Sequence, residues 1–306
     1  MPAALQSVIY SVSDRIARIT LDRPERGNGI TRRLIEELET CIEQADLDPT
    51  VHVIVLAGNG KGFCGGYDLV ESAEGAMRPE EGEAEPPAGS PLDPAVIAAN
   101  HDPAGTWDPM VDYAMMSRNV QGFTSLQRCG KPVVCKVHGF CVAGGTDLAL
   151  CADLLVIAAN AKIGYPPARV WGAPTTSMWA SMLGSQRAKR LLFTGDCLSG
   201  VEAQEWGLAI DSPPPDELDE RTEVLVERIA RLPVNQLRMM KLLVDESVHT
   251  KELHMSQVLG TLLDGIARHT PEGYQFQQRA MEAGFRQAVK ERDEPFGDRG
   301  DSTFKG

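Results

Sequence analysis

The chain has 306 residues, of which 42% are apolar, 24% charged and 6% aromatic, a composition typical of a soluble globular protein of one or two domains. Its 30 Lys and Arg residues face 43 Asp and Glu residues, so the formal charge of −13 argues against nucleic acid and anionic membranes as partners. No apolar run approaches the roughly 18 residues that a membrane span requires.

The seven cysteines show no CxxC spacing, and a chain of this size needs no disulfides to stabilise its core. We therefore expect reduced thiols and a cytoplasmic location. The first twelve residues lack a basic segment followed by an apolar one, so we expect no signal peptide.

The N-terminal part predicts a hairpin, a helix and a buried strand. Residues 7–22 alternate as two strands around a turn at Ser13 and Asp14. Thr31 is placed to cap a helix with apolar residues at helical spacing up to Ala45. Residues 51–57 are apolar except at His52, as expected for a buried strand.

The same alternation returns in the middle of the chain. We expect a buried strand at 133–137, a short helix at 145–152 and another strand at 154–158. Strands that alternate with helices favour a parallel sheet covered by helices, and therefore an α/β fold.

Beyond about residue 186 the pattern becomes helical. A helix at 186–193 should end at Gly195, and Ser199 with Glu202 spells a capping box. Four amphipathic stretches then predict a helical lobe, at 217–231, 234–248, 252–268 and 272–291.

The segment 71–109 is acidic and rich in proline, which breaks long helices, so we interpret it as an inserted surface loop. Large apolar side chains follow between Trp107 and Phe123. They suit a helix that lines an acyl pocket, or one that packs in the core.

Residues 60–65 match the GxGxxG spelling of a dinucleotide-binding turn. That fold also requires a long helix after the turn and an acidic residue about 20 positions later. The acidic proline-rich segment occupies that place, which argues against a nicotinamide enzyme.

Two glycine-rich elements each follow a predicted strand: FCGGYD at 63–68 and VAGGTD at 142–147. Free backbone N–H groups at such turns suit an oxygen that becomes anionic during a reaction, although a glycine pair also serves as a tight packing turn. The pair resembles the crotonase (enoyl-CoA hydratase/isomerase) superfamily. Further resemblance lies in LDRP at 21–24, KPVV at 131–134, TGD at 194–196, AxxWGL at 203–208 and KERDEPF at 290–296.

This resemblance covers nearly the whole chain apart from 71–119. It implies an α/β fold with a crotonase-type ββα spiral core over residues 1–205, interrupted by the insertion near 71–109, and a helical lobe over 206–306 that forms homotrimers or dimers of trimers.

The resemblance also assigns roles to individual residues. The backbone N–H groups of Tyr67 and Gly144 would bind the thioester oxygen of an acyl-CoA as it gains enolate charge. Asp147 stands where hydratases of the family carry a catalytic glutamate, although an acid in a first helical turn also stabilises the helix without catalysis.

The second glutamate of the family should fall within 164–172, yet that stretch contains no acidic residue. Tyr165 as an acid is one hypothesis for the missing group, and Asp112 or Tyr113 another. Arg169 would bind a substrate carboxylate or form a salt bridge.

Coenzyme A is expected only as part of the substrate, with no other cofactor and no metal site. Arg23 and Arg26, with a basic residue near Arg292 of a neighbouring subunit, would bind its phosphates. The residues flanking the two N–H donors would contact the thioester: Gly65, Gly66, Asp68, Leu69 and Gly145.

The expected activity is nominally that of an enoyl-CoA hydratase, with Asp147 as the principal acid–base group. Three alternatives stay open: a double-bond isomerase, which manages with one carboxylate, a decarboxylase or thioester hydrolase, and a catalytically weak acyl-CoA-binding protein.

Overall fold

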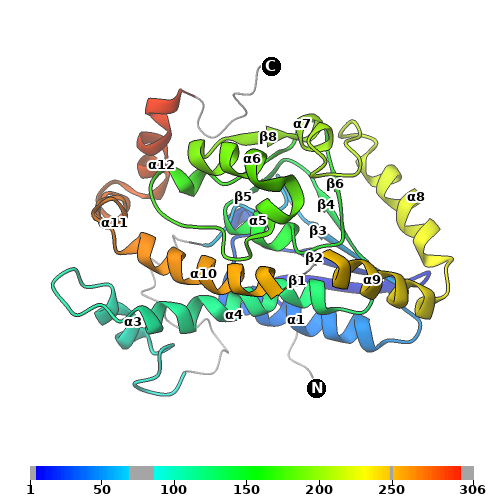
Figure 1. Ribbon diagram of the computed structural model, residues 1–306, viewed down its shortest axis with the longest axis horizontal. Coiled ribbons are helices and arrows are strands. Elements are labelled where there is room, and N and C mark those ends of the chain that lie inside the picture. The colour runs from blue at the N-terminus through cyan, green and yellow to red at the C-terminus, as the bar shows by residue number, and fades with distance from the viewer. Residues whose placement is uncertain (1–4, 69–85, 249–250, 298–306) are drawn as a thin grey trace.

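The computed structural model describes residues 5–68, 86–248 and 251–297, and Figure 1 shows its arrangement. A five-stranded sheet of order β1-β2-β3-β4-β6 forms the centre. β1 and β2 pair antiparallel, whereas β2, β3, β4 and β6 run parallel, as the alternation of strands and helices predicted. The strands are Val8–Ser13, Ile16–Leu21, Val53–Gly58, Val133–Val137 and Leu154–Ile157.

The hairpin turn lies one residue later than expected. Asp14 and Arg15 both adopt positive φ angles, 51° and 67°, which allow the tight connection between the two strands. Ser13 therefore still belongs to β1.

A smaller three-stranded sheet of order β5-β7-β8 lies beside the first. β5 (Phe140–Val142) pairs parallel with β7 (Lys162–Gly164), which pairs antiparallel with β8 (Cys197–Ser199). A single parallel bridge joins Cys64 to Cys141 and so ties the segment after β3 to this sheet.

Two long helices pack against each other below the sheet in Figure 1. Thr31 caps α1 (Arg32–Leu47) by accepting a hydrogen bond from Leu34 N–H, as predicted, and the apolar stripe of this helix is buried. α4 (Pro109–Arg128) follows α3 (Pro94–Asn100), a short helix inside the predicted loop that Asp93 caps. The first part of that insertion, 71–85, lies outside the described residues.

The remaining helices follow β8 or connect the strands. α6 bends where Gly184 leaves helical geometry, and the capping box of Ser199 and Glu202 opens α7 as expected. The expected helix at 272–291 is instead two helices, because Gly284 (φ 83°, ψ 149°) separates α11 from α12. The helices are α5 (Gly144–Ala149), α6 (Met178–Thr194), α7 (Gly200–Glu205), α8 (Leu218–Ala230), α9 (Val234–Val248), α10 (Lys251–Arg268), α11 (Pro271–Ala283) and α12 (Phe285–Asp293), with 3-10 turns η1 (Pro24–Arg26), η2 (Pro166–Arg169) and η3 (Glu294–Phe296).

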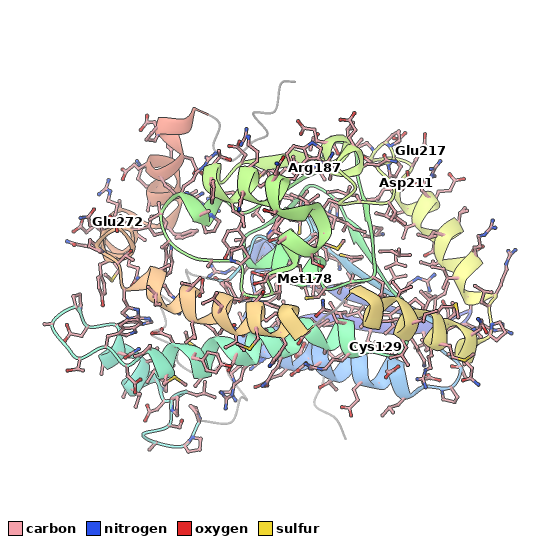
Figure 2. All side chains as sticks on the ribbon, viewed as in Figure 1. Cys129, Met178, Arg187, Asp211, Glu217 and Glu272 are labelled. Carbon is pink, nitrogen blue, oxygen red and sulfur yellow. The ribbon has the colours of Figure 1, made fainter. Side chains whose placement is uncertain are left out.

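Helix α10 lies along α4, and the two pack over much of their length (Figure 1). Side chains fill the interior between helices and sheets, where Cys129 after α4 and Met178 at the start of α6 are buried (Figure 2). All seven cysteines lie within the described residues, are buried and form no disulfide. Within the described residues, no helix is both long and apolar enough to cross a membrane.

Candidate active site

The two glycine-rich elements lie against each other. The Val142 N–H donates to the Cys64 carbonyl (3.0 Å), next to the parallel bridge between Cys64 and Cys141. A Cβ atom on Gly145 would lie 2.6 Å from the same carbonyl, so this position admits no side chain. Two segments about eighty residues apart in sequence therefore form one continuous backbone surface.

This surface presents the backbone of Tyr67 and Gly144. The Ile30 N–H donates to the Gly66 carbonyl (2.8 Å), and the Ile30 carbonyl accepts from the Asp68 N–H (3.0 Å). In this parallel pairing the Tyr67 N–H between them faces away from Ile30. Gly66 has a φ of 99°, and a Cβ atom on it would lie 3.3 Å from Gly144 N. Gly144 is the first residue of α5, where an N–H has no acceptor within the helix.

Ala143, between the loop and α5, adopts φ 55° and ψ −132°, a conformation that costs a non-glycine residue on the order of 1–3 kcal/mol. Its methyl group lies where a side chain of residue 66 would project. Strained backbone of this kind persists where surrounding structure holds it, commonly at functional sites.

The carboxyl group of Asp147 is buried on α5, one turn beyond Gly144. Its Oδ1 accepts hydrogen bonds from the N–H (3.0 Å) and hydroxyl (2.8 Å) of Thr176, whereas Oδ2 has no partner among the described residues. Burial raises the pKa of Asp147 to about 7; the Thr176 bonds oppose this shift, and the charge of Asp264 adds to it. The group can therefore hold or release a proton near neutral pH.

Two tyrosines lie within electrostatic range of Asp147. Burial raises the pKa of Tyr67 and of Tyr165 well above the ordinary value, and the charges of Asp147 and Asp264 raise both further. Within the described structure, the hydroxyl groups of Tyr67 and Thr175 are buried without a hydrogen-bond partner. The four residues expected to be catalytic, Tyr67, Gly144, Asp147 and Tyr165, are thus brought together.

A carboxylate and a guanidinium on α10 also belong to this region and were not predicted from the sequence. Asp264 accepts hydrogen bonds from the Ala173 N–H (3.2 Å) and from Arg268 (2.8 Å), and both side chains are largely buried. We call Asp264 and Arg268 the α10 pair. Their spacing of four residues on an otherwise apolar stretch was the available signal, but such pairs are also common on solvent-exposed helix faces.

Arg23 and Arg26 both contact the buried carboxylate of Asp68. Arg26 donates two hydrogen bonds to it (3.1 and 2.8 Å), and Arg23 forms an ion pair at 3.1 Å. The Gly65 N–H bonds to the Gly27 carbonyl (2.9 Å) and closes the same loop. These expected substrate-binding residues thus gather around η1, while Leu69 lies outside the described residues.

Arg169 forms the salt bridge that was one of its two interpretations. Its guanidinium contacts Asp196 (3.1 Å) and Asp293 (3.3 Å) and bonds to the Thr194 carbonyl (2.9 Å). Arg190 and Arg292 complete the Arg169 cluster by donating to the same two carboxylates. The Arg169 side chain is almost fully buried and already contacts two carboxylates, so it is not available to a substrate carboxylate.

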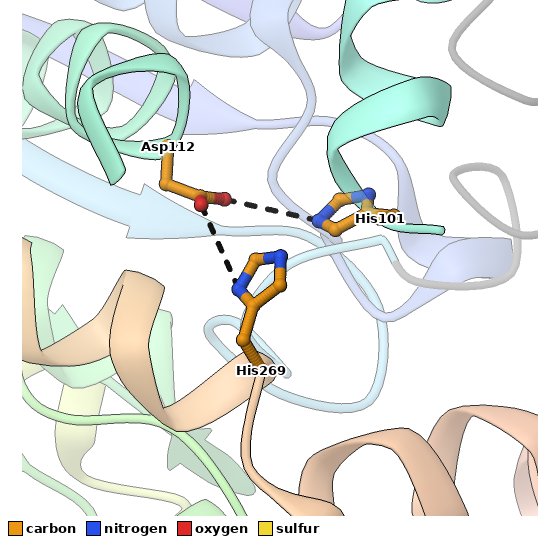
Figure 3. Close-up of side chains that lie close together, drawn as sticks. All are labelled: His101, Asp112 and His269. Carbon is orange, nitrogen blue, oxygen red and sulfur yellow. Dashed lines mark ion pairs between the residues drawn. The ribbon is translucent and has the colours of Figure 1, made fainter. Parts of the chain in front are cut away.

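Asp112 lies in a separate polar cluster with His101 and His269 (Figure 3). Its Oδ2 accepts from Asn100 (3.1 Å) and Trp107 (2.7 Å), and Arg268 lies 3.6 Å from Oδ1. These partners occupy the carboxylate, so Asp112 is poorly placed for the proton-transfer role considered for it.

Among the described residues, His101, Asp112 and His269 form the one group with a donor set that a metal ion would accept. Both ring nitrogens of His269 face carbonyl oxygens, those of Gly265 (2.9 Å) and Asn100 (3.1 Å). A neutral imidazole has a single N–H and can donate to only one of these carbonyls, and the nearby Arg268 would repel a cation bound here. The cluster instead joins α3, α4 and the end of α10 through hydrogen bonds.

Comparison with known proteins places this arrangement in context. The family model described as enoyl-CoA hydratase/isomerase matches residues 11–87 and 104–281. A crystal structure of an enoyl-CoA hydratase from Mycobacterium smegmatis is similar with a TM-score of 0.91 and 54% identity over 98% of both chains.

Two curated relatives show the range of reactions in the family. A mevalonyl-coenzyme A hydratase of Beauveria bassiana is 31% identical over 68% of this chain and 66% of its own length. A 1,2-epoxyphenylacetyl-CoA isomerase of Escherichia coli is 26% identical over 78% of this chain and 81% of its own. The family model covers well over half of the chain, and the chain therefore belongs to the enoyl-CoA hydratase/isomerase family.

Proposed function

We propose that this protein adds water to the double bond of enoyl-CoA thioesters. One observation carries the proposal: the Asp147 carboxyl, with one unpartnered oxygen and a pKa of about 7, is buried beside the surface that presents the Tyr67 and Gly144 backbone. An acid–base group next to two N–H donors is what enolate chemistry on a thioester requires.

In the proposed reaction, the N–H groups of Tyr67 and Gly144 bind the thioester oxygen. Water adds to Cβ, the electron pair of the double bond moves toward the thioester, and the two donors stabilise the resulting enolate, a contribution of several kcal/mol in comparable sites. Asp147 gives its proton to Cα, and the proton that the added water loses restores Asp147, with the Tyr165 hydroxyl as the proposed carrier.

The experiment incubates the protein with saturated and unsaturated acyl-CoA thioesters in heavy water, with Asp147→Asn alongside. We expect α-deuterium uptake and a product heavier by one water, and a fall of about 10²–10⁴-fold in the variant. No exchange and no product despite coenzyme A binding would contradict the proposal and favour an acyl-CoA-binding protein.

A double-bond isomerase is the second candidate, favoured by the absence of an acidic residue within 164–172. An isomerase moves one proton and manages with one carboxylate. It would give a product of unchanged mass with a shifted double bond, whereas decarboxylation or thioester hydrolysis would release carbon dioxide or free coenzyme A.

We propose further that Arg23 and Arg26 bind coenzyme A phosphates and that no other cofactor takes part. The Arg26 side chain keeps about a third of its surface exposed while it bonds to Asp68, so it can reach a second anion. Arg26→Ala should raise KM with kcat unchanged, and dialysis against a chelator should leave the rate unaltered.

A homotrimer or dimer of trimers is the proposed assembly. Helices α9 and α10 leave large apolar side chains more than two-fifths exposed, which is unusual over so wide an area of a monomer. Light scattering of the purified protein tests the assembly. Seven buried cysteines that form no disulfide support the proposed cytoplasmic location. The exposed residues are Met239, Met240, Leu242, Leu243, Val244, Met255, Leu259, Leu263 and Ile266.

A further inference from the structure

We infer that Asp264 of α10 is the second acid–base group of the site and takes the proton that water loses when it adds to the double bond. The inference rests on the proposed hydration. It assigns to a helix of the C-terminal part the role for which the segment 164–172 offers no carboxylate.

The position of Asp264 next to Tyr165 supports this role. A Cβ atom built on Gly172 would lie 3.5 Å from Asp264 Oδ1 and 3.6 Å from the Tyr165 hydroxyl oxygen. The Asp264 carboxylate and the Tyr165 hydroxyl therefore both lie beside the position that a side chain of residue 172 would occupy, and Gly172, which adopts a φ of 105°, has no side chain there.

The charge of Asp264 acts on the other titratable groups of the proposed site. The Asp264 charge raises the pKa of Asp147, Tyr67 and Tyr165, so the carboxylate lies within range of every group of the proposed site. Asp264 itself forms an ion pair with Arg268, and its side chain keeps about a tenth of its surface exposed. Two carboxyl groups held in contrasting environments suit one acid and one base.

The two carboxylate oxygens of Asp264 have different partners. Arg268 donates to Asp264 Oδ2 and lies 3.6 Å from Asp112, whereas Oδ1 accepts only the backbone N–H of Ala173 among the described residues. An ionised carboxylate oxygen can accept a second hydrogen bond. Oδ1, on the Tyr165 side, is therefore the atom available to a water molecule.

In the proposed step every proton and electron pair has a destination. As the water oxygen bonds to Cβ, one O–H bond breaks and its proton passes to Asp264, while the π pair of the double bond forms the enolate. The enolate then takes the proton of Asp147 at Cα. The proton on Asp264 returns to Asp147 through the Tyr165 hydroxyl, which restores both carboxyl groups.

The test separates the two proton transfers. α-Deuterium exchange of butyryl-CoA in heavy water requires the enolate and Asp147 alone, whereas hydration of short-, medium- and long-chain 2-enoyl-CoA thioesters requires both carboxyl groups. For Asp264→Asn we expect a fall in kcat for hydration of about 10²-fold or more, with KM unchanged and exchange kept within about tenfold. Asp264→Glu should recover part of the hydration rate.

Asp153→Asn is the matched control, because Asp153 also accepts a backbone N–H, that of Val133 (2.7 Å), and pairs with a cation, Lys241 (2.9 Å). It should leave both rates unchanged. Equal loss of exchange and hydration in Asp264→Asn, or no loss of either, would overturn the inference. So would a wild-type protein that exchanges deuterium but hydrates no thioester, whereas failure of exchange in the wild type would overturn the proposed function itself.

Discussion

The Arg169 cluster and the Asp147 site both bury carboxyl groups, but they differ in how completely their polar atoms are paired. In the cluster, Asp293 accepts hydrogen bonds from Arg169 and Arg292. In the site, one oxygen of Asp147 and the hydroxyl of Tyr67 have no partner within the described structure.

This difference distinguishes a fully paired arrangement of buried polar groups from one that leaves atoms for a ligand, as the proposed site requires. Folded proteins satisfy nearly all buried polar atoms, so several unpaired atoms in one place need an explanation. A bound substrate or water that supplies the missing bonds is the simplest one, and the paired cluster requires none. Stability and activity should therefore respond in opposite ways to changes in the two regions.

The largest effect on stability is expected for Asp293→Asn. The substitution keeps the shape but removes the negative charge that faces both Arg169 and Arg292. Breaking a buried ion pair costs about 3–5 kcal/mol, and Asp196, which still faces Arg169, keeps the expected loss at the lower end of this range. Urea unfolding should show a loss of this size, with the hydration rate per folded molecule retained. A loss below about 1 kcal/mol would show that the pairing is not what stabilises this region.

Asp147→Asn should change stability in the opposite direction, and the size of the effect should depend on pH. The pKa of Asp147 is about 7 in the folded protein against 3.8 for a free side chain, so the folded state binds more protons between these values. Wild-type stability therefore falls as the pH rises through this window, and the penalty, on the order of a few kcal/mol, is complete above pH 7.

The asparagine variant carries no such charge, and its side-chain carbonyl can still accept from Thr176. Its melting temperature should exceed that of the wild type at about pH 8, and the difference should shrink toward pH 4, where both side chains are neutral. A difference that does not vary with pH would contradict the raised pKa.

Gly66→Ala should affect both stability and activity. The new Cβ would lie 2.7 Å from that of Ala143 and force apart the two loops that present the N–H donors. We expect destabilisation of about 1–3 kcal/mol and a loss of hydration of about tenfold or more. Gly207→Ala is the control, because Gly207 also has a positive φ, 79°, but no atom lies within 4 Å of its Cβ position.

Tyr67→Phe should have the smallest effect, because it removes a hydroxyl group that has no partner among the described residues. Burying an unpaired hydroxyl is unfavourable, so unfolding should show a change of no more than about 1 kcal/mol, toward greater stability. A loss of stability beyond that value would reveal a partner for the hydroxyl, such as a structural water.

Local patterns predicted most of the framework. The hairpin, the Thr31 cap and the capping box at Ser199 depend on residues close in sequence, and all three are confirmed. The break at Gly284 was missed because helices tolerate an isolated glycine, and only its backbone angles show that this one ends α11.

The site was predictable where it consists of contiguous motifs. The family resemblance predicted that the loops around Tyr67 and Gly144 lie together. Asp147 lies in the second of these motifs, and Tyr165 lies in the segment 164–172 where the family carries its second glutamate. Asp264 could not be found this way, because its place depends on which side of α10 packs beside Gly172. Asp112 was considered for the second proton-transfer group, but its carboxylate accepts hydrogen bonds from Asn100 and Trp107.

Helix α10 carries Asp264 into the interior, while Leu259, Leu263 and Ile266 on the same helix stay exposed. In the proposed assembly, a subunit seated on that apolar stripe would restrict the helix and therefore the carboxylate. By thermodynamic linkage, an arrangement of Asp264 that association favours would in turn favour association, and dilution would weaken both. Helix α10 would then couple protein concentration to the geometry of the proposed reaction.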